Sequence, residues 1–187
     1  NIVMVGEIRD AETANIAVQA ALTGHLVLSS LHTNDAPTAV PRLTDMGVPP
    51  FLIAAVVNTI LAQRLVRRIH LGCVESYVPD PQTITAVRDE FVKLDVDLAS
   101  VRLPHTFYRG RGCAVCAETG YLGRIGIYEM LAVTESIRTF IMGPSFSLDG
   151  LRHAAREAGM VTMFEDGVDK VTRGLTTIEE VFRVVRE

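Results

Sequence analysis

The beginning of the chain alternates between short apolar runs and segments of mixed polarity. Residues 1–6 read as a continuous apolar strand, of the kind that is buried on both faces of a parallel sheet. A second strand is expected at residues 26–30. The segment between them opens with Asp10, a good helix N-cap, and reaches Gly24, a residue type that commonly ends helices. The pattern therefore predicts a strand, a helix running to Thr23, and a parallel strand joined by a right-handed crossover.

The next apolar segments predict two further helices. One is expected over residues 35–46, and Pro41 should kink it because proline has no backbone N–H to donate. Residues 48–66 form the most apolar segment of the chain. Pro50 and Asn58 interrupt it, so it falls short of the roughly 18 uninterrupted apolar residues that a membrane span needs. This segment is therefore expected to be a buried core helix.

The second half of the chain changes its pattern twice. Residues 61–69 and 123–133 each predict a strand, and the two are expected to pair across the intervening region. That region, residues 70–121, is less regular and contains all three cysteines. Residues 134–187 have helical periodicity, and a Thr-Thr-Ile-Glu-Glu run predicts a capped start for the last helix.

Composition and charge narrow the classes of partner. With 48% hydrophobic and 21% charged residues, the 187-residue chain can bury a core of one or two domains. A net charge of −4 and a pI near 5.7 give no reason to expect a nucleic-acid or anionic-membrane partner. Three cysteines without a signal-peptide pattern suit a reducing compartment, so a cytoplasmic protein is expected. The chain enters a strand at once, and it is expected to begin inside a domain.

Two titratable residues follow the two N-terminal strands. Glu7 ends the first strand and His32 comes just after the second, so both should lie beyond the carboxyl edge of the sheet, where ligands of α/β folds bind. A carboxylate there can position an attacking water, and an imidazole can hydrogen-bond a terminal phosphate. The alternatives are a simple salt bridge between Glu7 and Arg9, and a structural role for each histidine.

The cysteines suggest a metal site. Cys113 and Cys116 have the two-residue spacing that lets both thiolates reach one zinc ion, and His70 and Cys73 repeat that spacing. Four such ligands make a closed, structural site with no open position for catalysis. A redox-active cysteine pair and metal-free thiols remain as alternatives, and His105 is a reserve ligand with poorer spacing.

Several long motifs occur together in order. The stretch MVGEIRDAETANIAVQAALTGHLVLSSLHTND resembles the Walker B segment and histidine box of the type II secretion and type IV pilus assembly ATPases. The resemblance continues through RLTDMGVPPFLIA, LAQRLVRR, CAVCAETGYLGRIGIYEML and AGMVTMFEDGVDKVTRGLTTIEEV, and so covers nearly the whole chain. It implies an α/β fold with part of a RecA-like P-loop NTPase core and its parallel sheet over residues 1–69 and 122–133. Residues 70–121 would be a small zinc-binding insertion, and residues 134–187 a C-terminal helical subdomain.

The resemblance also implies roles for individual residues. Glu7 would be the catalytic Walker B glutamate, and His32 would sense the terminal phosphate of ATP bound with Mg²⁺. The other residues assigned to the nucleotide site are Gly6, where many other ATPases have aspartate, Arg9, Asp10 and His25. In the family the first metal-binding pair is Cys-x-x-Cys, so His70 replaces a cysteine as a ligand of Zn²⁺.

The family implies an assembly and a place in the cell. Its members are homo-hexamers that act on an inner-membrane platform protein, associated peripherally with the cytoplasmic face of that membrane through partners. The cysteine-bearing insertion favours the assembly and secretion motors over the pilus retraction motors. The phosphate-binding Walker A loop is expected before residue 1, so the chain alone should neither bind ATP tightly nor hydrolyse it. The alternative function is a non-catalytic, zinc-stabilised scaffold that binds the same platform.

Overall fold

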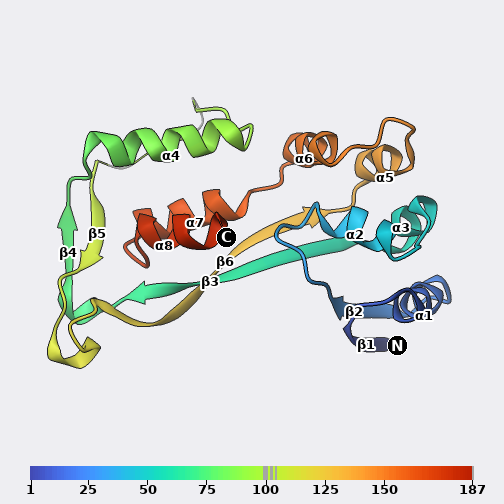
Figure 1. The fold of residues 1–187 in the computed structure, drawn as a ribbon, viewed down its shortest axis with the longest axis horizontal. Helices are drawn as coiled ribbons and strands as arrows, with labels where there is room; N and C mark the ends of the chain where they lie inside the picture. Colours follow the sequence, from blue (N-terminus) through green and yellow to red (C-terminus); the bar gives the residue numbers. More distant parts are fainter. Residues whose placement is uncertain (99–100, 102, 104, 187) are drawn as a thin grey trace. The chain divides into compact units, whose positions relative to one another are not determined.

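The computed structural model describes residues 1–98, 101, 103 and 105–186 (Figure 1). Its helices and strands, in chain order, are β1 (Ile2–Glu7), α1 (Ala11–Leu22), β2 (Leu26–Ser30), α2 (Ala39–Asp45), α3 (Pro50–Val56), β3 (Thr59–Ile69), β4 (Val74–Tyr77), α4 (Pro81–Lys93), β5 (Phe107–Gly110), β6 (Tyr121–Ala132), α5 (Glu135–Met142), α6 (Leu148–Glu157), α7 (Met163–Thr172) and α8 (Ile178–Val185). Two short 3₁₀ helices, η1 (Leu71–Cys73) and η2 (Ala114–Cys116), complete the set. In the part of the chain that the structure describes, we find no helix with the length and apolarity of a membrane span.

The chain forms two compact units. The first comprises residues 1–62 and 130–160, and the second residues 63–129 and 161–187. The boundary falls inside both β3 and β6, which pair with each other as predicted. This division reflects contacts within the chain. It does not test the domain boundaries expected from the family resemblance, which stay a prediction.

The predicted strand, helix and parallel strand at the start of the chain are confirmed. The predicted burial of the first strand on both faces is wrong, because every second residue of β1 is exposed. β1 and β2 pair in parallel, with Ile2 opposite Leu26. Asp10 caps α1, because its carboxylate accepts a hydrogen bond from the Thr13 N–H at 2.8 Å. After the helix, Gly24 has a φ of +90°, a conformation that glycine adopts without strain. The described residues form three two-stranded sheets, so the larger parallel sheet of a RecA-like core stays a prediction.

The second predicted helix is shorter than expected. The Asp35 carboxylate accepts a hydrogen bond from the Thr38 N–H at 2.8 Å, and this turn delays the start of α2 until Ala39. Pro41 therefore lies in the first helical turn, where N–H groups have no partner within the helix. The predicted kink assumed that Pro41 lies in the interior of the helix, and this assumption is wrong.

The predicted core helix over residues 48–66 is also wrong. α3 ends at Val56, and Val57 already has an extended backbone with a ψ of 123°. Pro50, at the first helical position, starts α3, and β3 follows from Thr59 with buried and exposed positions interleaved. The boundary was missed because a continuous apolar run does not distinguish a buried helix from a buried strand.

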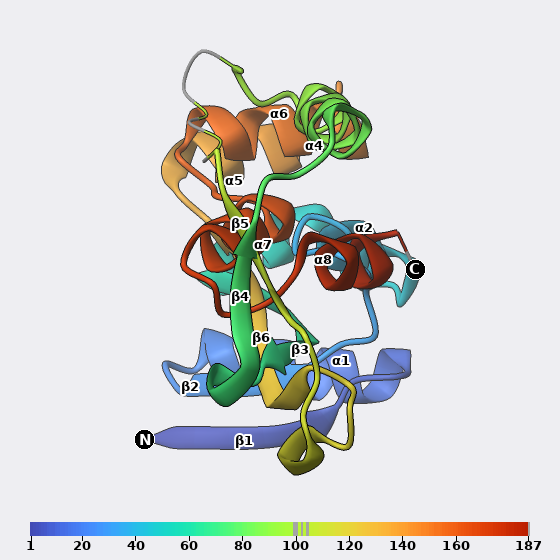
Figure 2. The ribbon, with the colours of Figure 1, turned by 90° about the vertical axis from the view of Figure 1, so that its left-hand side faces the viewer.

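The region between β3 and β6 is more regular than the sequence suggested. β4 and β5 pair in an antiparallel ribbon and lie side by side, with α4 between them in the sequence (Figures 1 and 2). Each of these strands has only four residues, too few to show a clear alternation. The start of α4 did carry a signal, since Asp80 caps the helix and Pro81 occupies its first position.

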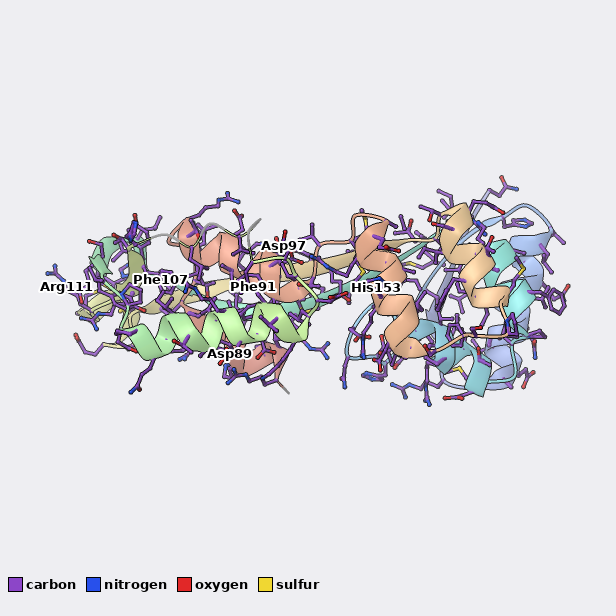
Figure 3. The ribbon with its side chains drawn as sticks, turned by 90° about the horizontal axis from the view of Figure 1, so that it is seen from above. Asp89, Phe91, Asp97, Phe107, Arg111 and His153 are labelled. Atoms are coloured by element: carbon purple, nitrogen blue, oxygen red, sulfur yellow. The ribbon has the colours of Figure 1, made fainter. Side chains whose placement is uncertain are left out.

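An aromatic core holds the second unit together. Phe91 on α4 packs edge-on against Phe164 on α7 with ring centroids 5.1 Å apart, and Phe107 on β5 is fully buried. Figure 3 shows Asp89 on the other side of α4 from Phe91, so the helix turns its apolar side to this core. Burying each of these phenylalanines stabilises the unit by roughly 2–3 kcal/mol.

The predicted helical periodicity after residue 134 corresponds to four helices. α5 and α6 belong to the first compact unit, and α7 and α8 to the second. Thr162 and Glu165 form a reciprocal capping box at the start of α7, and Thr177 caps α8 by accepting from the Glu180 N–H. The prediction placed the start of the last helix correctly but did not separate α7 from its neighbours.

Candidate active site and metal centre

A β-bulge shapes the carboxyl edge of β1. Met4 pairs with Leu28 and Glu7 with Ser30, so one extra residue is accommodated in β1 between these two pairs. The Ser29 hydroxyl donates to the Gly6 carbonyl at 2.6 Å across this irregularity. Because a bulge shifts the alternation of side chains, it re-aims the residue that follows it, which here is Glu7.

The carboxylate of Glu7 contacts two side chains, those of His32 and Arg9. His32 Nε2 lies 3.0 Å from Glu7 Oε1, and the Arg9 guanidinium approaches Glu7 Oε2 with Nη2 at 2.5 Å and Nε at 2.7 Å. The Arg9 hydrogen bond, together with the charges of Arg9 and His32, lowers the pKa of Glu7 in spite of its desolvation. Glu7 therefore forms the salt bridge with Arg9 and also contacts the histidine that follows the next strand, while its catalytic role stays a prediction.

The surroundings of this pair are open. The His32 side chain is 86% exposed and that of Glu7 is 22% exposed. A Cβ added to Gly6 would meet no atom within 4 Å. Asp10 is nearby in sequence, but its carboxylate is engaged in capping α1 through Thr13, and this lowers the pKa of Asp10. The structure thus leaves Glu7 and His32 accessible at the edge, with Arg9 holding the carboxylate ionised.

His25 lies at the opposite end of the strand pair. It precedes β2, whereas His32 follows it, and five residues of β2 separate the two ends by about 16 Å. The Nδ1 atom of His25 is 3.1 Å from the Thr23 hydroxyl and 3.2 Å from the Ala20 carbonyl, against the end of α1. The structure does not bring His25 to Glu7, and its assignment to the nucleotide site stays a prediction.

The four predicted metal ligands come together in the second unit. One ligand atom from each of His70, Cys73, Cys113 and Cys116 lies within 4.8 Å of every other. Cys73 and Cys116 are buried, and His70 and Cys113 are partly buried. His105 is not a member of this cluster. The two segments that carry these residues meet because Ile69 ends β3 and Tyr121 begins β6, two strands that pair.

The sulfur positions fit tetrahedral coordination. Cys116 Sγ lies 3.9 Å from Cys73 Sγ and 3.6 Å from Cys113 Sγ, whereas Cys113 Sγ lies 3.3 Å from His70 Nδ1. A tetrahedral zinc ion with metal–sulfur distances near 2.3 Å requires sulfur separations of about 3.8 Å. The donor set of three thiols and one imidazole therefore fits Zn²⁺.

Backbone N–H groups support the thiolate form of Cys116. The N–H groups of Cys113 and Gly120 donate to Cys116 Sγ at 3.2 and 3.3 Å. Burial alone would raise the pKa of Cys116, but these donors lower it to about 6. A thiolate is the form that binds metal. Burial raises the pKa of Cys73, so Cys116 is the first of these two buried thiols to ionise.

Two glycines allow the cluster to close. A Cβ on Gly110 would lie 2.1 Å from the Gly120 carbonyl oxygen, and a Cβ on Gly120 would lie 2.4 Å from the Gly110 carbonyl oxygen. Gly120 also has a φ of +77°. Only glycine fits this close backbone crossing, which brings the Gly120 N–H to Cys116.

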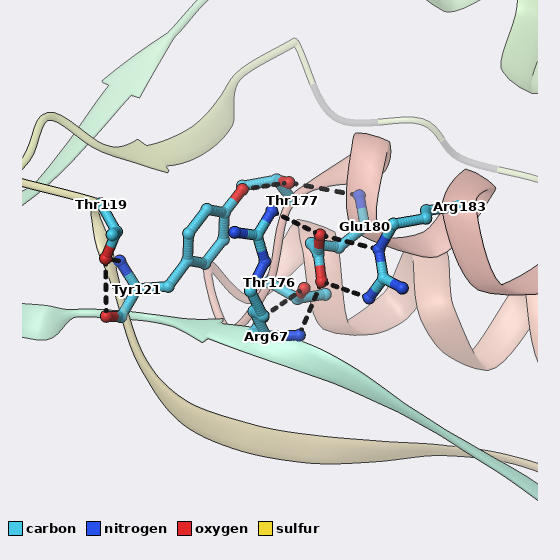
Figure 4. Close-up of polar contacts among 7 residues, drawn as sticks. All are labelled: Arg67, Thr119, Tyr121, Thr176, Thr177, Glu180 and Arg183. Carbon is cyan, nitrogen blue, oxygen red and sulfur yellow. Dashed lines mark hydrogen bonds and ion pairs between the residues drawn. The ribbon is translucent and has the colours of Figure 1, made fainter.

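A second acidic residue was missed by sequence reasoning. The Glu180 side chain is 2% exposed and accepts hydrogen bonds from the Arg67 N–H and from the guanidinium groups of Arg67 and Arg183 (Figure 4). Arg67 also lies 4.2 Å above the centre of the Tyr121 ring. For Arg67, on β3, the structure thus gives a partner inside the chain. No local pattern predicts the pairing of Glu180 with Arg67, because the two residues are 113 positions apart.

Comparison with known proteins now identifies the family. The family model for Type II/IV secretion system protein matches residues 1–183. The type II secretion system protein E of Pseudomonas aeruginosa is 48% identical over 187 residues, which is 100% of this chain and 35% of that protein. The type IV pilus assembly ATPase PilB of Thermus thermophilus is 46% identical over 181 residues, which is 97% of this chain and 19% of that protein. The chain thus spans only a minor part of these curated relatives.

Solved structures show the same fold at lower identity. The pilus retraction motor PilT with bound ADP superposes with a TM-score of 0.61 at 23% identity, covering 98% of this chain and 39% of that one. The ATPase DotB of Legionella pneumophila superposes with a TM-score of 0.61 at 20% identity, covering 99% and 38%. These likenesses support the α/β fold. With the family model matched over residues 1–183 and an identity of 48% across its full length, this chain belongs to the type II/IV secretion system protein family.

Proposed function

We propose that this chain carries the hydrolytic edge of a hexameric, magnesium-dependent ATPase that powers type IV pilus assembly or type II protein secretion. The observation that carries the proposal is the 3.0 Å approach of His32 Nε2 to the Glu7 carboxylate at the carboxyl edge of a parallel strand pair. The names of the curated relatives, a secretion protein and a pilus assembly ATPase, supply the reaction and the process.

The chemistry follows from the charges at this edge. Glu7 is kept ionised by Arg9 at Oε2, so Oε1, the oxygen that faces His32, can accept a hydrogen bond from the attacking water and orient it toward the terminal phosphate. Because its pKa is lowered, Glu7 is a weak base and acts mainly by positioning. His32 can donate from Nε2 to a phosphate oxygen when it leaves Glu7, which makes the pair responsive to the presence of that phosphate.

A magnesium ion fits the donors at this edge. Hard carboxylate and phosphate oxygens are its preferred ligands, and Glu7 could contact it through a bound water. An ion bound there would neutralise part of the negative charge of the phosphates. The space beside Gly6, where a Cβ would meet nothing within 4 Å, is the position at which many other ATPases have aspartate. Arg9, Asp10 and Gly6 shape this loop in the proposal.

The cysteine cluster is proposed to hold a structural zinc ion. Four protein ligands would leave no open position, so the metal would do no chemistry on a substrate. It would tie η1 to η2 and thereby fix the return of the chain into β6. The close match of the sulfur separations to a tetrahedron favours zinc over a redox-active cysteine pair.

The full-length protein is proposed to work as an assembly at a membrane. A homo-hexamer, an inner-membrane platform protein as partner and a position at the cytoplasmic face of the inner membrane all follow from the family resemblance. The rival function is a zinc-stabilised scaffold that binds the platform without hydrolysis. The naming of relatives as ATPases disfavours it.

The decisive experiment is steady-state ATP hydrolysis by the full-length protein that carries this chain, compared with its Glu7→Gln variant. Glutamine keeps the shape of the side chain and removes its charge, so we expect turnover to fall by about 10²–10³-fold while nucleotide binding survives. Glu12→Gln is the matched control, because Glu12 is an exposed carboxylate in the first turn of α1. Equal turnover in wild type and Glu7→Gln, or none in either, would favour the scaffold.

A further inference from the structure

The loop that carries His32 is anchored to the rest of the protein near its C-terminal end. It connects β2 to α2, and the His32 side chain at its beginning is 86% exposed. At its other end Ala36 is fully buried. Between them Asp35 accepts hydrogen bonds from the N–H and the hydroxyl of Thr38, which closes a turn. The position of His32 therefore depends on how firmly Asp35 is fixed.

Asp35 has a second partner from a distant part of the chain. Arg152 Nη2 on α6 donates to Asp35 Oδ2 at 2.7 Å, although 117 residues separate the two. The Asp35 side chain is 26% exposed and that of Arg152 is 44% exposed. Burial alone would raise the pKa of Asp35, but the hydrogen bonds from Thr38 and Arg152 lower it, so the carboxylate is ionised and the pair is charge-assisted.

Arg152 is presented by a well-anchored helix. Its neighbour Leu151 and, one turn later, Ala155 are both 0% exposed. A Cβ on Gly150 would lie 2.5 Å from the Phe140 ring of α5, so α6 packs closely against α5 at this point. Arg152 also reaches Asp149 at 3.1 Å, but the Asp149 side chain is 95% exposed and does not belong to the loop.

We infer that Arg152 is a positioning residue for ATP hydrolysis, which holds the His32 loop against Glu7 through its ion pair with Asp35. The inference rests on the proposed function of the Glu7 and His32 edge. It adds a role for α6, because a displacement of this helix would be transmitted through Asp35 to His32. Arg152 itself touches neither Glu7 nor His32 in any hydrogen bond or ion pair that the described residues make.

The rate of hydrolysis depends on where the loop places the imidazole of His32. Only two residues lie between His32 and Asp35, so a shift of the Asp35 carboxylate moves the imidazole almost directly. A misplacement near 1 Å can reduce the rate of a positioned reaction by about 100-fold. Loss of one of the two anchors of Asp35 leaves the Thr38 turn intact, so a smaller reduction, about 10-fold, is expected.

The test measures kcat and KM for ATP in the full-length protein with Arg152→Gln, Asp149→Asn and His32→Asn, singly and combined. We expect Arg152→Gln to lower kcat about 10-fold with little change in KM, because Arg152 does not contact nucleotide. Arg152→Lys should recover part of that loss. Asp149→Asn is the matched control, since it removes the exposed partner of Arg152 and leaves the Asp35 contact in place. It should behave as wild type.

The double variant separates positioning from general destabilisation. If Arg152 acts through His32, then Arg152→Gln should cause no further loss of kcat in a His32→Asn background. Equal rates for Arg152→Gln and Asp149→Asn would overturn the inference, as would an undiminished loss in the His32→Asn background. Either of those results leaves the proposed function standing, provided that the wild-type protein hydrolyses ATP and Glu7→Gln does not. Absence of turnover in the wild type would instead overturn the proposed function.

Discussion

Glu7 and Glu180 are two carboxylates with similar partners and opposite surroundings. Each accepts hydrogen bonds from an arginine, and in each the pKa is lowered. Glu7 keeps partners that are largely exposed, with Arg9 73% and His32 86% accessible. Glu180 is 2% exposed and accepts from three groups on Arg67 and Arg183. The comparison teaches that the fully satisfied carboxylate stabilises the fold, while the accessible one remains available to water and ligand.

Among the changes in the unit that contains Glu180, loss of the metal cluster is expected to reduce stability most. Removing zinc with a chelator, or replacing Cys116 by Ser, should destabilise this unit by several kcal/mol, because metal binding and local folding are coupled. Hydrogen exchange at β4 and β5, with zinc content measured by mass spectrometry, checks this.

His105→Asn is the matched control for the metal experiment, since His105 lies outside the cluster. It should keep one zinc ion per chain, as should Glu7→Gln. A metal-free protein with unchanged exchange in β4 and β5 would show that the cluster is not a structural zinc site.

The next largest loss of stability is expected when the hydrogen bonds of Glu180 with Arg67 and Arg183, here called the Glu180 network, are removed. Glu180→Gln leaves two arginines without their shared anion, and breaking a buried ion pair costs about 3–5 kcal/mol. Because the Arg67 and Arg183 side chains are 52% and 47% exposed, they can regain water, and we expect about 2–3 kcal/mol. Glu7→Gln should change stability far less, because the partners of Glu7 are exposed. Urea unfolding of the two variants sharpens the comparison, and equal destabilisation would contradict it.

The same contrast should appear on acidification. The pKa of Glu180 is about 2 in the folded protein against a usual 4.5, because the arginine hydrogen bonds outweigh the cost of burial. Its stabilisation is therefore complete above pH 4.5 and is lost as the pH falls toward 2. Stability measured across this window should fall less steeply in Glu180→Gln than in wild type. Parallel curves for the two proteins would exclude Glu180 as the source of the acid sensitivity.

A smaller loss of stability than that of Glu180→Gln is expected at the edge of the same network. Tyr121 Oη and the Thr177 hydroxyl are 2.9 Å apart, and the Tyr121 ring also supports Arg67. Tyr121→Phe removes one hydrogen bond and keeps the ring, so it should cost about 1 kcal/mol. Tyr121→Leu removes both contacts and should cost more. If Phe and Leu destabilise equally, the ring contributes nothing measurable to holding Arg67.

Much of the candidate site could be predicted from local sequence. Glu7 stands at the end of an apolar strand and Asp10 at a helix start, and both positions follow from nearest-neighbour patterns. The spacing of Cys113 and Cys116 likewise predicts shared coordination. The length of α3 could not be predicted, because an apolar segment suits a buried helix and a buried strand equally well.

The amino-acid sequence by itself determined the local elements and the chemical identity of the groups: strand, glutamate, histidine and the cysteine pairs. The tertiary structure decided which of them meet. It placed His25 at the far end of β2 from His32, buried Glu180 against Arg67, and joined Arg152 to Asp35 across 117 residues. The physical reason is that capping and spacing act within a turn or two of the chain. Burial and ion pairing between distant segments depend on packing that no short stretch specifies.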